Sequence, residues 1–80
     1  MSKPYEITGK ESVSDLLCEL RNELISVSSS LYMGFETLPE SDNEDFLADK
    51  YVFAKHAVDH GRAAFAIAAT LEQKLREMGL

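Results

Sequence analysis

The chain has 80 residues, which suffice for one domain with a modest hydrophobic core. Its single cysteine, Cys18, excludes an internal disulfide, and its net charge of −6 disfavours nucleic acids and anionic membranes as partners. Residues 1–10 lack the apolar run of a signal peptide, and no segment reaches the roughly 20 apolar residues that span a bilayer. We therefore expect a cytoplasmic protein that binds neither nucleic acid nor membranes.

Residues 1–11 show no helical pattern. Pro4 and Gly9 disfavour a helix, while Tyr5 and Ile7 alternate with polar neighbours as in a short strand. A strand this short needs a partner strand, and the sequence shows none. We expect an extended N-terminal arm whose Tyr5 and Ile7 pack on the helices that follow.

A first helix is predicted over about residues 13–36. Ser12 followed by Asp15 is a loose capping box, and an acid suits the first turn of a helix. The apolar residues then recur at the 4-3 spacing of a heptad, which predicts a coiled-coil-like seam between helices that pack lengthwise. They are Val13, Leu17, Leu20, Leu24, Val27 and Leu31. The serines at 28–30 should lie on the outer side of this seam, and a break in the helix there is the alternative.

Residues 37–43 form the predicted turn. Pro39 disfavours a helix through the residue before it, and Ser41 begins the capping box Ser-Asp-Asn-Glu. A second helix is expected over about residues 43–78, with Gly79 as its C-terminal cap. Gly61 either breaks this helix or lets another backbone approach closely. The seam of the second helix again has 4-3 spacing, through Leu47, Tyr51, Ala54, Val58, Gly61, Phe65, Ala68, then Leu71 or Glu72, and Leu75.

These elements predict an all-α fold, a helical hairpin of two long antiparallel helices. The second helix also carries a further apolar edge that a lone hairpin would leave exposed, and exposed apolar surfaces usually mark interfaces. A homodimer that forms a four-helix bundle would cover this edge. The predicted dimer or packing interface consists of Leu17, Leu20, Leu24, Leu31, Phe46, Phe53, Ala57, Ala64, Ile67 and Leu71.

His56 and His60 lie one helical turn apart, with Asp59 between them. The string is similar to the inverted zinc-protease motif His-x-x-Glu-His, but it has Asp in place of Glu, and the chain contains no third histidine. The pair also lies opposite the predicted seam. We expect a solvated face without a metal, and the alternative is a pH-sensitive dimer contact.

The many acidic residues could bind a metal if they had the spacing found in metal-dependent helical enzymes. Dimeric all-α nucleotide pyrophosphohydrolases hold magnesium with Glu-x-x-Glu and Glu-x-x-Asp pairs, but Asn22 follows Glu19 at that spacing. Asp42 and Asp45 have the spacing but lie at the predicted helix cap. No Glu-x-x-His pair of the di-iron bundles occurs. We predict no enzyme and no cofactor.

Cys18 lies beside the seam, with Asp15 and Glu19 as acidic neighbours. A nucleophilic cysteine needs a base or a positive environment to form its thiolate, and these acids oppose that. We expect Cys18 to be a small, partly buried thiol with no catalytic role.

Six acids and no base occur between residues 36 and 49, and we call them the acidic cluster. Acids suit a helix N-terminus and a solvated turn, which is the structural interpretation. The functional interpretation is a negative patch that binds a basic surface of another protein. Its members are Glu36, Glu40, Asp42, Glu44, Asp45 and Asp49.

In size, acidity and hairpin layout the chain is similar to short helical-hairpin proteins of bacterial and prophage genomes, which include small inhibitors of host factors. Our leading hypothesis is a homodimeric protein-binding module that acts by stoichiometric association, as an inhibitor, adaptor or regulator. The alternative is an obligate structural subunit or chaperone-like partner of a non-identical helical protein. A metal-dependent hydrolase is the remote alternative.

Overall fold

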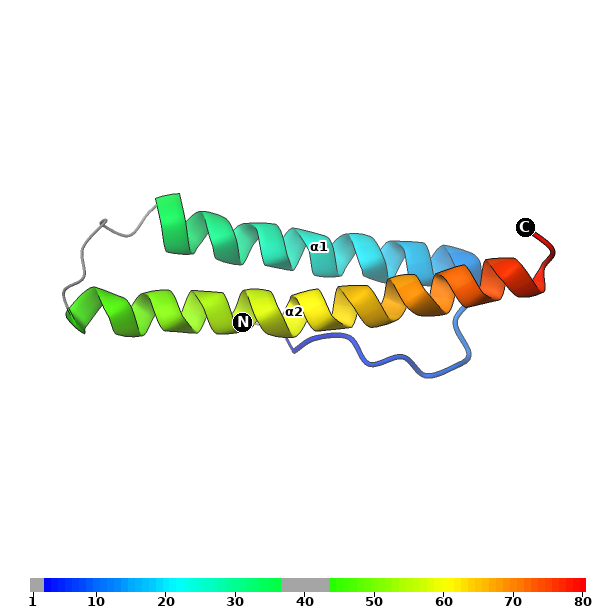
Figure 1. Cartoon of the computed structure of the whole chain (residues 1–80), viewed down its shortest axis with the longest axis horizontal. Helices are drawn as coiled ribbons and strands as arrows, with labels where there is room; N and C mark the ends of the chain where they lie inside the picture. The colour runs from blue at the N-terminus through cyan, green and yellow to red at the C-terminus, as the bar shows by residue number, and fades with distance from the viewer. Residues whose placement is uncertain (1–2, 37–43) are drawn as a thin grey trace.

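The chain folds into two antiparallel helices and an extended arm (Figure 1). The computed structural model describes residues 3–36 and 44–80, and the side chains of residues 3–34 and 47–80. Helix α1 spans Val13–Glu36 and helix α2 spans Glu44–Glu77. The helices pack along their length in a molecule of 53 × 20 × 14 Å. The predicted all-α helical hairpin is therefore confirmed, while the predicted turn lies outside the described residues.

Two caps fix the outer ends of the helices. At the start of α1, the Ser12 N–H donates to Oδ2 of Asp15 at 3.0 Å, and the Asp15 N–H donates to Oγ of Ser12 at 3.1 Å, which confirms the predicted capping box. After α2, Gly79 adopts a φ of +88°. Its N–H donates to the Arg76 carbonyl and the Leu80 N–H donates to the Leu75 carbonyl, the two bonds of a Schellman motif.

The contact between the helices mixes polar and apolar residues. Among the described side chains, the buried apolar ones are Leu16, Ala64 and Ile67. Glu23, Ser30 and His60 are also buried, so polar groups occupy central positions of the contact. Three of these residues, Leu16, Glu23 and Ser30, recur every seventh residue of α1 and therefore lie on one face of the helix.

This contact differs from the predicted seam. The leucines of that seam on α1, Leu17, Leu24 and Leu31, are exposed, and Ser30 is buried although the serines were expected to face outward. The seam lies on the flank of the hairpin because the buried row Leu16–Glu23–Ser30 is offset from it by one residue, about 100° around the helix.

The two helical glycines have opposite surroundings. Helix α2 continues through Gly61, and a Cβ added there would meet no atom within 4 Å. The close approach expected at Gly61 instead occurs at Gly34, where an added Cβ would lie 3.1 Å from the Cβ of Phe53. Gly34 therefore brings α1 and α2 together near the turn.

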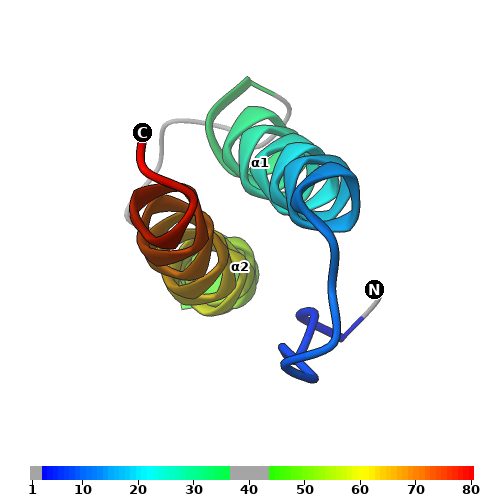
Figure 2. The same cartoon turned by 90° about the vertical axis from the view of Figure 1, so that its right-hand side faces the viewer.

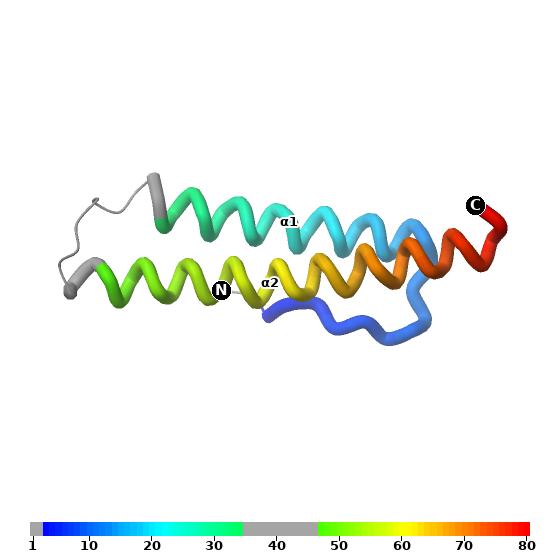
Figure 3. The backbone as a smooth tube through the Cα atoms, viewed as in Figure 1, coloured from blue at the N-terminus to red at the C-terminus, as the bar shows by residue number. Residues whose placement is uncertain are grey.

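The arm runs back along the hairpin from the start of α1 (Figure 3). Tyr5 and Ile7 are half-buried, and the described part of the arm contains no strand. Seen along the helices, α1, α2 and the arm occupy three corners of a triangle, so the arm lies along one side of the hairpin (Figure 2). Within the described residues, no helix combines the length and the apolar character needed to cross a membrane.

Candidate functional site: an open apolar face opposite a clamped arm

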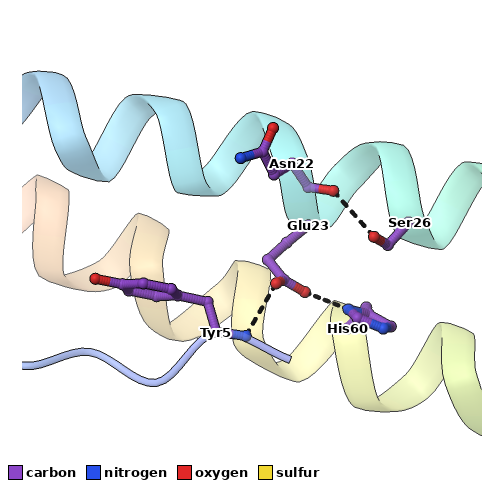
Figure 4. A network of polar contacts seen from close by, with 5 residues as sticks. All are labelled: Tyr5, Asn22, Glu23, Ser26 and His60. Carbon is purple, nitrogen blue, oxygen red and sulfur yellow. Dashed lines mark hydrogen bonds and ion pairs between the residues drawn. The ribbon is translucent and has the colours of Figure 1, made fainter. Parts of the chain in front are cut away.

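Glu23 connects three segments of the chain. Its Oε2 lies 2.5 Å from Nδ1 of His60 on α2, and its Oε1 accepts a hydrogen bond of 2.9 Å from the N–H of Tyr5 in the arm (Figure 4). An ionised carboxylate can only accept, so Nδ1 of His60 is the donor. Glu23 and His60 are 5% and 2% exposed. This buried pair fixes the level at which α1 and α2 face each other.

Glu11 closes the turn between the arm and α1. Its Oε2 accepts from the N–H and the hydroxyl of Thr8 at 2.7 and 2.9 Å and from the Tyr5 hydroxyl at 2.5 Å, and its Oε1 accepts from the Gly9 N–H at 2.9 Å. The Thr8 N–H and the Tyr5 hydroxyl lower the pKa of Glu11 to about 2. The same hydroxyl bond raises the pKa of Tyr5 to about 12.

The arm is also bound to α2. The Lys74 ammonium donates a hydrogen bond of 2.6 Å to the Glu11 carbonyl. Together with the bond from Tyr5 to Glu23, this contact attaches the arm to both helices. The arm is therefore a structural part of the hairpin rather than a loose tail.

Two predictions about reactive side chains are wrong. His60 was expected to face water, but it is buried against Glu23, and half-buried His56 stacks on it with the ring centroids 6.5 Å apart. Cys18 was expected to be partly buried, but it is exposed. Among the described residues, no group of three or more histidine, cysteine or acidic side chains could hold a metal ion.

The predicted seam of α1 forms an exposed apolar row. Leu17 and Leu24 are both 53% exposed, and Leu31 is 43% exposed. An apolar groove lies along this row, lined by Leu17, Leu20, Arg21, Leu24, Ile25 and Ser28. Nothing in the described chain covers these leucines.

The predicted seam of α2 is exposed as well. Val58 and Phe65 are 50% and 76% exposed. A row of small residues, Ala54, Gly61 and Ala68, recurs every seventh residue beside them and is exposed or half-buried. Each helix therefore presents part of its predicted seam to the outside, while other members such as Leu20, Val27 and Leu71 are half-buried.

Both rows lie on the same side of the hairpin. Leu31 and Ala54 line one small cavity between the helices, together with Ser30, Gly34, Lys50 and Phe53. The arm lies on the opposite side. Tyr5 of the arm is close enough to half-buried Glu19 to be affected by its charge. Glu19 and Leu20 lie on opposite sides of the buried row of α1, and Leu20 is on the side of the leucine row. We call the surface opposite the arm the open face; it consists of Leu17, Leu24, Leu31, Ala54, Val58, Gly61, Phe65 and Ala68.

The predicted interface residues thus divide into two groups. Ala64 and Ile67 are buried between the helices, and Leu20, Phe53, Ala57 and Leu71 are half-buried. Leu17, Leu24 and Leu31 belong to the open face, and the side chain of Phe46 lies outside the described residues. Of the acidic cluster, the structure describes the side chain of Asp49, which is exposed; those of Glu36, Glu40, Asp42, Glu44 and Asp45 lie outside the described residues.

No protein-family model, no curated protein and no solved structure matches this chain.

Proposed function

We propose that this chain is a protein-association module that acts by stoichiometric binding, and that it forms a homodimeric four-helix bundle through the open face. The observation that carries the proposal is the exposure of two heptad-spaced apolar rows on one side of the hairpin. Apolar patches of this extent on small proteins mark interaction surfaces.

The small buried core supports the same proposal. Among the described residues, three apolar side chains are buried while thirteen large apolar ones are exposed. A chain of this size without disulfides needs further apolar burial to be stable. Association through the open face supplies that burial.

A matched pair of substitutions tests the proposal. Leu24 belongs to the leucine row and is 53% exposed. Val52 on α2 is 44% exposed, but it lies about 200° around the helix from Ala54 and is therefore outside the open face. We expect Leu24→Ser to weaken dimerisation about 100-fold or more, because each dimer buries two copies of this side chain. Val52→Ser should leave the dissociation constant within a few-fold, as measured by sedimentation equilibrium. Equal effects of the two substitutions, or a monomeric unmodified protein, would contradict the proposal.

The second part of the proposed function concerns a partner other than a second copy. With the open face occupied by the dimer, we propose that the acidic cluster binds a protein with a basic surface, on the sequence argument alone. Charge reversal at Glu40, Asp42, Glu44 and Asp45 should abolish capture of that partner and leave helicity unchanged. Capture that persists after charge reversal would contradict this part. Failure to form a homodimer, combined with an aggregating monomer, would favour a non-identical helical partner on the open face.

A further inference from the structure

The two rows of the open face are in register. Two contacts give the level of α1 against α2: Glu23 with His60, and Gly34 with Phe53. The bond from Lys74 to the carbonyl of Glu11, two residues before α1, agrees with them. Interpolation between these contacts places each leucine of α1 level with one small residue of α2. The level pairs are Leu17 with Ala68, Leu24 with Gly61, and Leu31 with Ala54. The cavity that Leu31 and Ala54 both line agrees with the last pair.

The rows are complementary in size. A second hairpin can oppose the open face about a twofold axis parallel to the helices or about one perpendicular to them. The parallel axis sets α1 of each copy against α2 of the other at the same level. Each leucine then faces a small residue, which gives every layer of the core a similar width. The perpendicular axis sets leucine against leucine and alanine against alanine, which would require very unequal distances between the helices.

Gly61 supports the first arrangement. A glycine inside a helix costs about 1 kcal/mol relative to alanine. No atom of the residues that the structure describes lies within 4 Å of where its Cβ would be, so no described contact within the hairpin explains the glycine. A leucine from a second copy would occupy this space.

We infer that the open face binds a second copy about the twofold axis parallel to the helices, with Leu24 of each copy packed over Gly61 of the other. This mode of binding rests on the proposed homodimer. The available area suits a stable dimer. The helices overlap over about 36 Å, at 1.5 Å per residue of α1, and two helices of about 10 Å diameter lying side by side make a face about 20 Å wide. That face measures about 700 Å² per copy, close to the roughly 800 Å² that each partner buries in a standard interface.

Site-directed disulfide formation tests the mode. In a Cys18→Ser background, one chain carries Leu24→Cys and a second carries Gly61→Cys, and the two are mixed, unfolded and refolded together before mild oxidation. We expect a cross-linked dimer from the mixture and little from either chain alone, because a disulfide needs Cα atoms about 5.5 Å apart. Efficient cross-linking of the Leu24→Cys chain to itself would overturn the mode while leaving the dimer in place.

A bulky substitution at Gly61 gives an independent test that does not depend on thiol geometry. Gly61→Leu should leave the helicity of the chain unchanged or higher, because the position is open and leucine favours helix, but it should weaken dimerisation at least 100-fold. Ala66→Leu is the matched control at an exposed position outside the open face, and it should leave the dissociation constant within a few-fold. A Gly61→Leu dimer as tight as the unmodified one would overturn the mode. A monomeric unmodified protein would overturn both the mode and the proposed homodimer.

Discussion

At the scale of single residues, the least expected feature is the buried polar layer of the hairpin. Glu23 places one carboxylate oxygen on His60 and the other on the N–H of Tyr5. Burying such groups stabilises little by itself, because their desolvation offsets the attraction between them. Removing one of them leaves the other without its partner in a site from which water is excluded. The layer therefore selects one register among the many that apolar rows allow.

We predict that Glu23→Ala lowers the free energy of unfolding by about 3 kcal/mol, because His60 and the Tyr5 N–H lose their acceptor. Glu23→Gln should cost less, since an amide can still accept from the Tyr5 N–H. The neighbouring exposed Asn22→Ala should change stability by less than about 0.5 kcal/mol. Denaturant unfolding at one fixed protein concentration measures all three. Equal stability of Glu23→Ala and Asn22→Ala would contradict a structural role for the layer.

The sequence alone could not reveal this layer. The 4-3 rule assigns apolar residues to the interior, so Ser30 and His60 were placed outside and Glu23 was given no role. A signal was present in the repeat of Leu16, Glu23 and Ser30 every seventh residue. It could be interpreted only once the hairpin register had brought Glu23 to His60.

At the scale of elements, the arm is held by two carboxylates and one ammonium group. Glu11 accepts four hydrogen bonds from the turn that precedes α1, Glu23 accepts one from Tyr5, and Lys74 donates one to the Glu11 carbonyl. The bonds to the Glu11 side chain are strongest when that carboxyl is ionised, and the bond from the Tyr5 hydroxyl needs its proton. The attachment of the arm should therefore depend on pH at both extremes.

We predict that the Glu11 carboxyl titrates with a midpoint near pH 2 and the Tyr5 hydroxyl near pH 12. The pKa of Glu11 is lowered on folding, so its contribution is complete above 4.5 and is lost as the pH falls toward 2. The pKa of Tyr5 is raised, so its contribution is complete below 10 and is lost as the pH rises toward 12. Carbon-detected NMR titration measures both. Glu11→Gln should return the titration midpoint of Tyr5 toward 10. A midpoint near 4.5 for Glu11 in the unmodified protein would contradict the hydrogen bonds that the arm donates to its carboxylate.

The contact between α1 and α2 near the turn depends on Gly34. Gly34→Ala should lower the free energy of unfolding by about 1 kcal/mol, because the new Cβ would crowd the Cβ of Phe53 by more than the gain in helix propensity offsets. Ser29→Ala, at an exposed position of the same helix, should raise it by a few tenths of a kcal/mol. Thermal unfolding followed by circular dichroism compares the two, and a stabilising Gly34→Ala would show that the helices do not approach closely here.

The helices and their caps could be predicted from the sequence because the deciding signals are local. Ser12 and Asp15 form the capping box that their spacing indicates, and Gly79 ends α2. The pairing of the apolar rows could not be predicted, because periodicity indicates that a row packs against another surface without showing which surface that is. The seam leucines were assigned to the hairpin, whereas Leu16 and Ile67, together with buried polar residues, bring its helices together.

At the scale of the whole molecule, the hairpin is asymmetric. The arm lies along one side (Figure 2). The opposite side carries the exposed residues of the open face. The arm thus leaves one side of the hairpin available for association. This asymmetry explains why a single twofold dimer, rather than open-ended assembly, is the arrangement we propose.

The most direct test of this account is the molar mass of the unmodified protein in solution, measured by size exclusion with light scattering over a dilution series. A mass of about twice 8.9 kDa that falls only on strong dilution is the predicted result. A well-folded monomer of 8.9 kDa at all concentrations would contradict it. In that case the open face would have to bind a different protein.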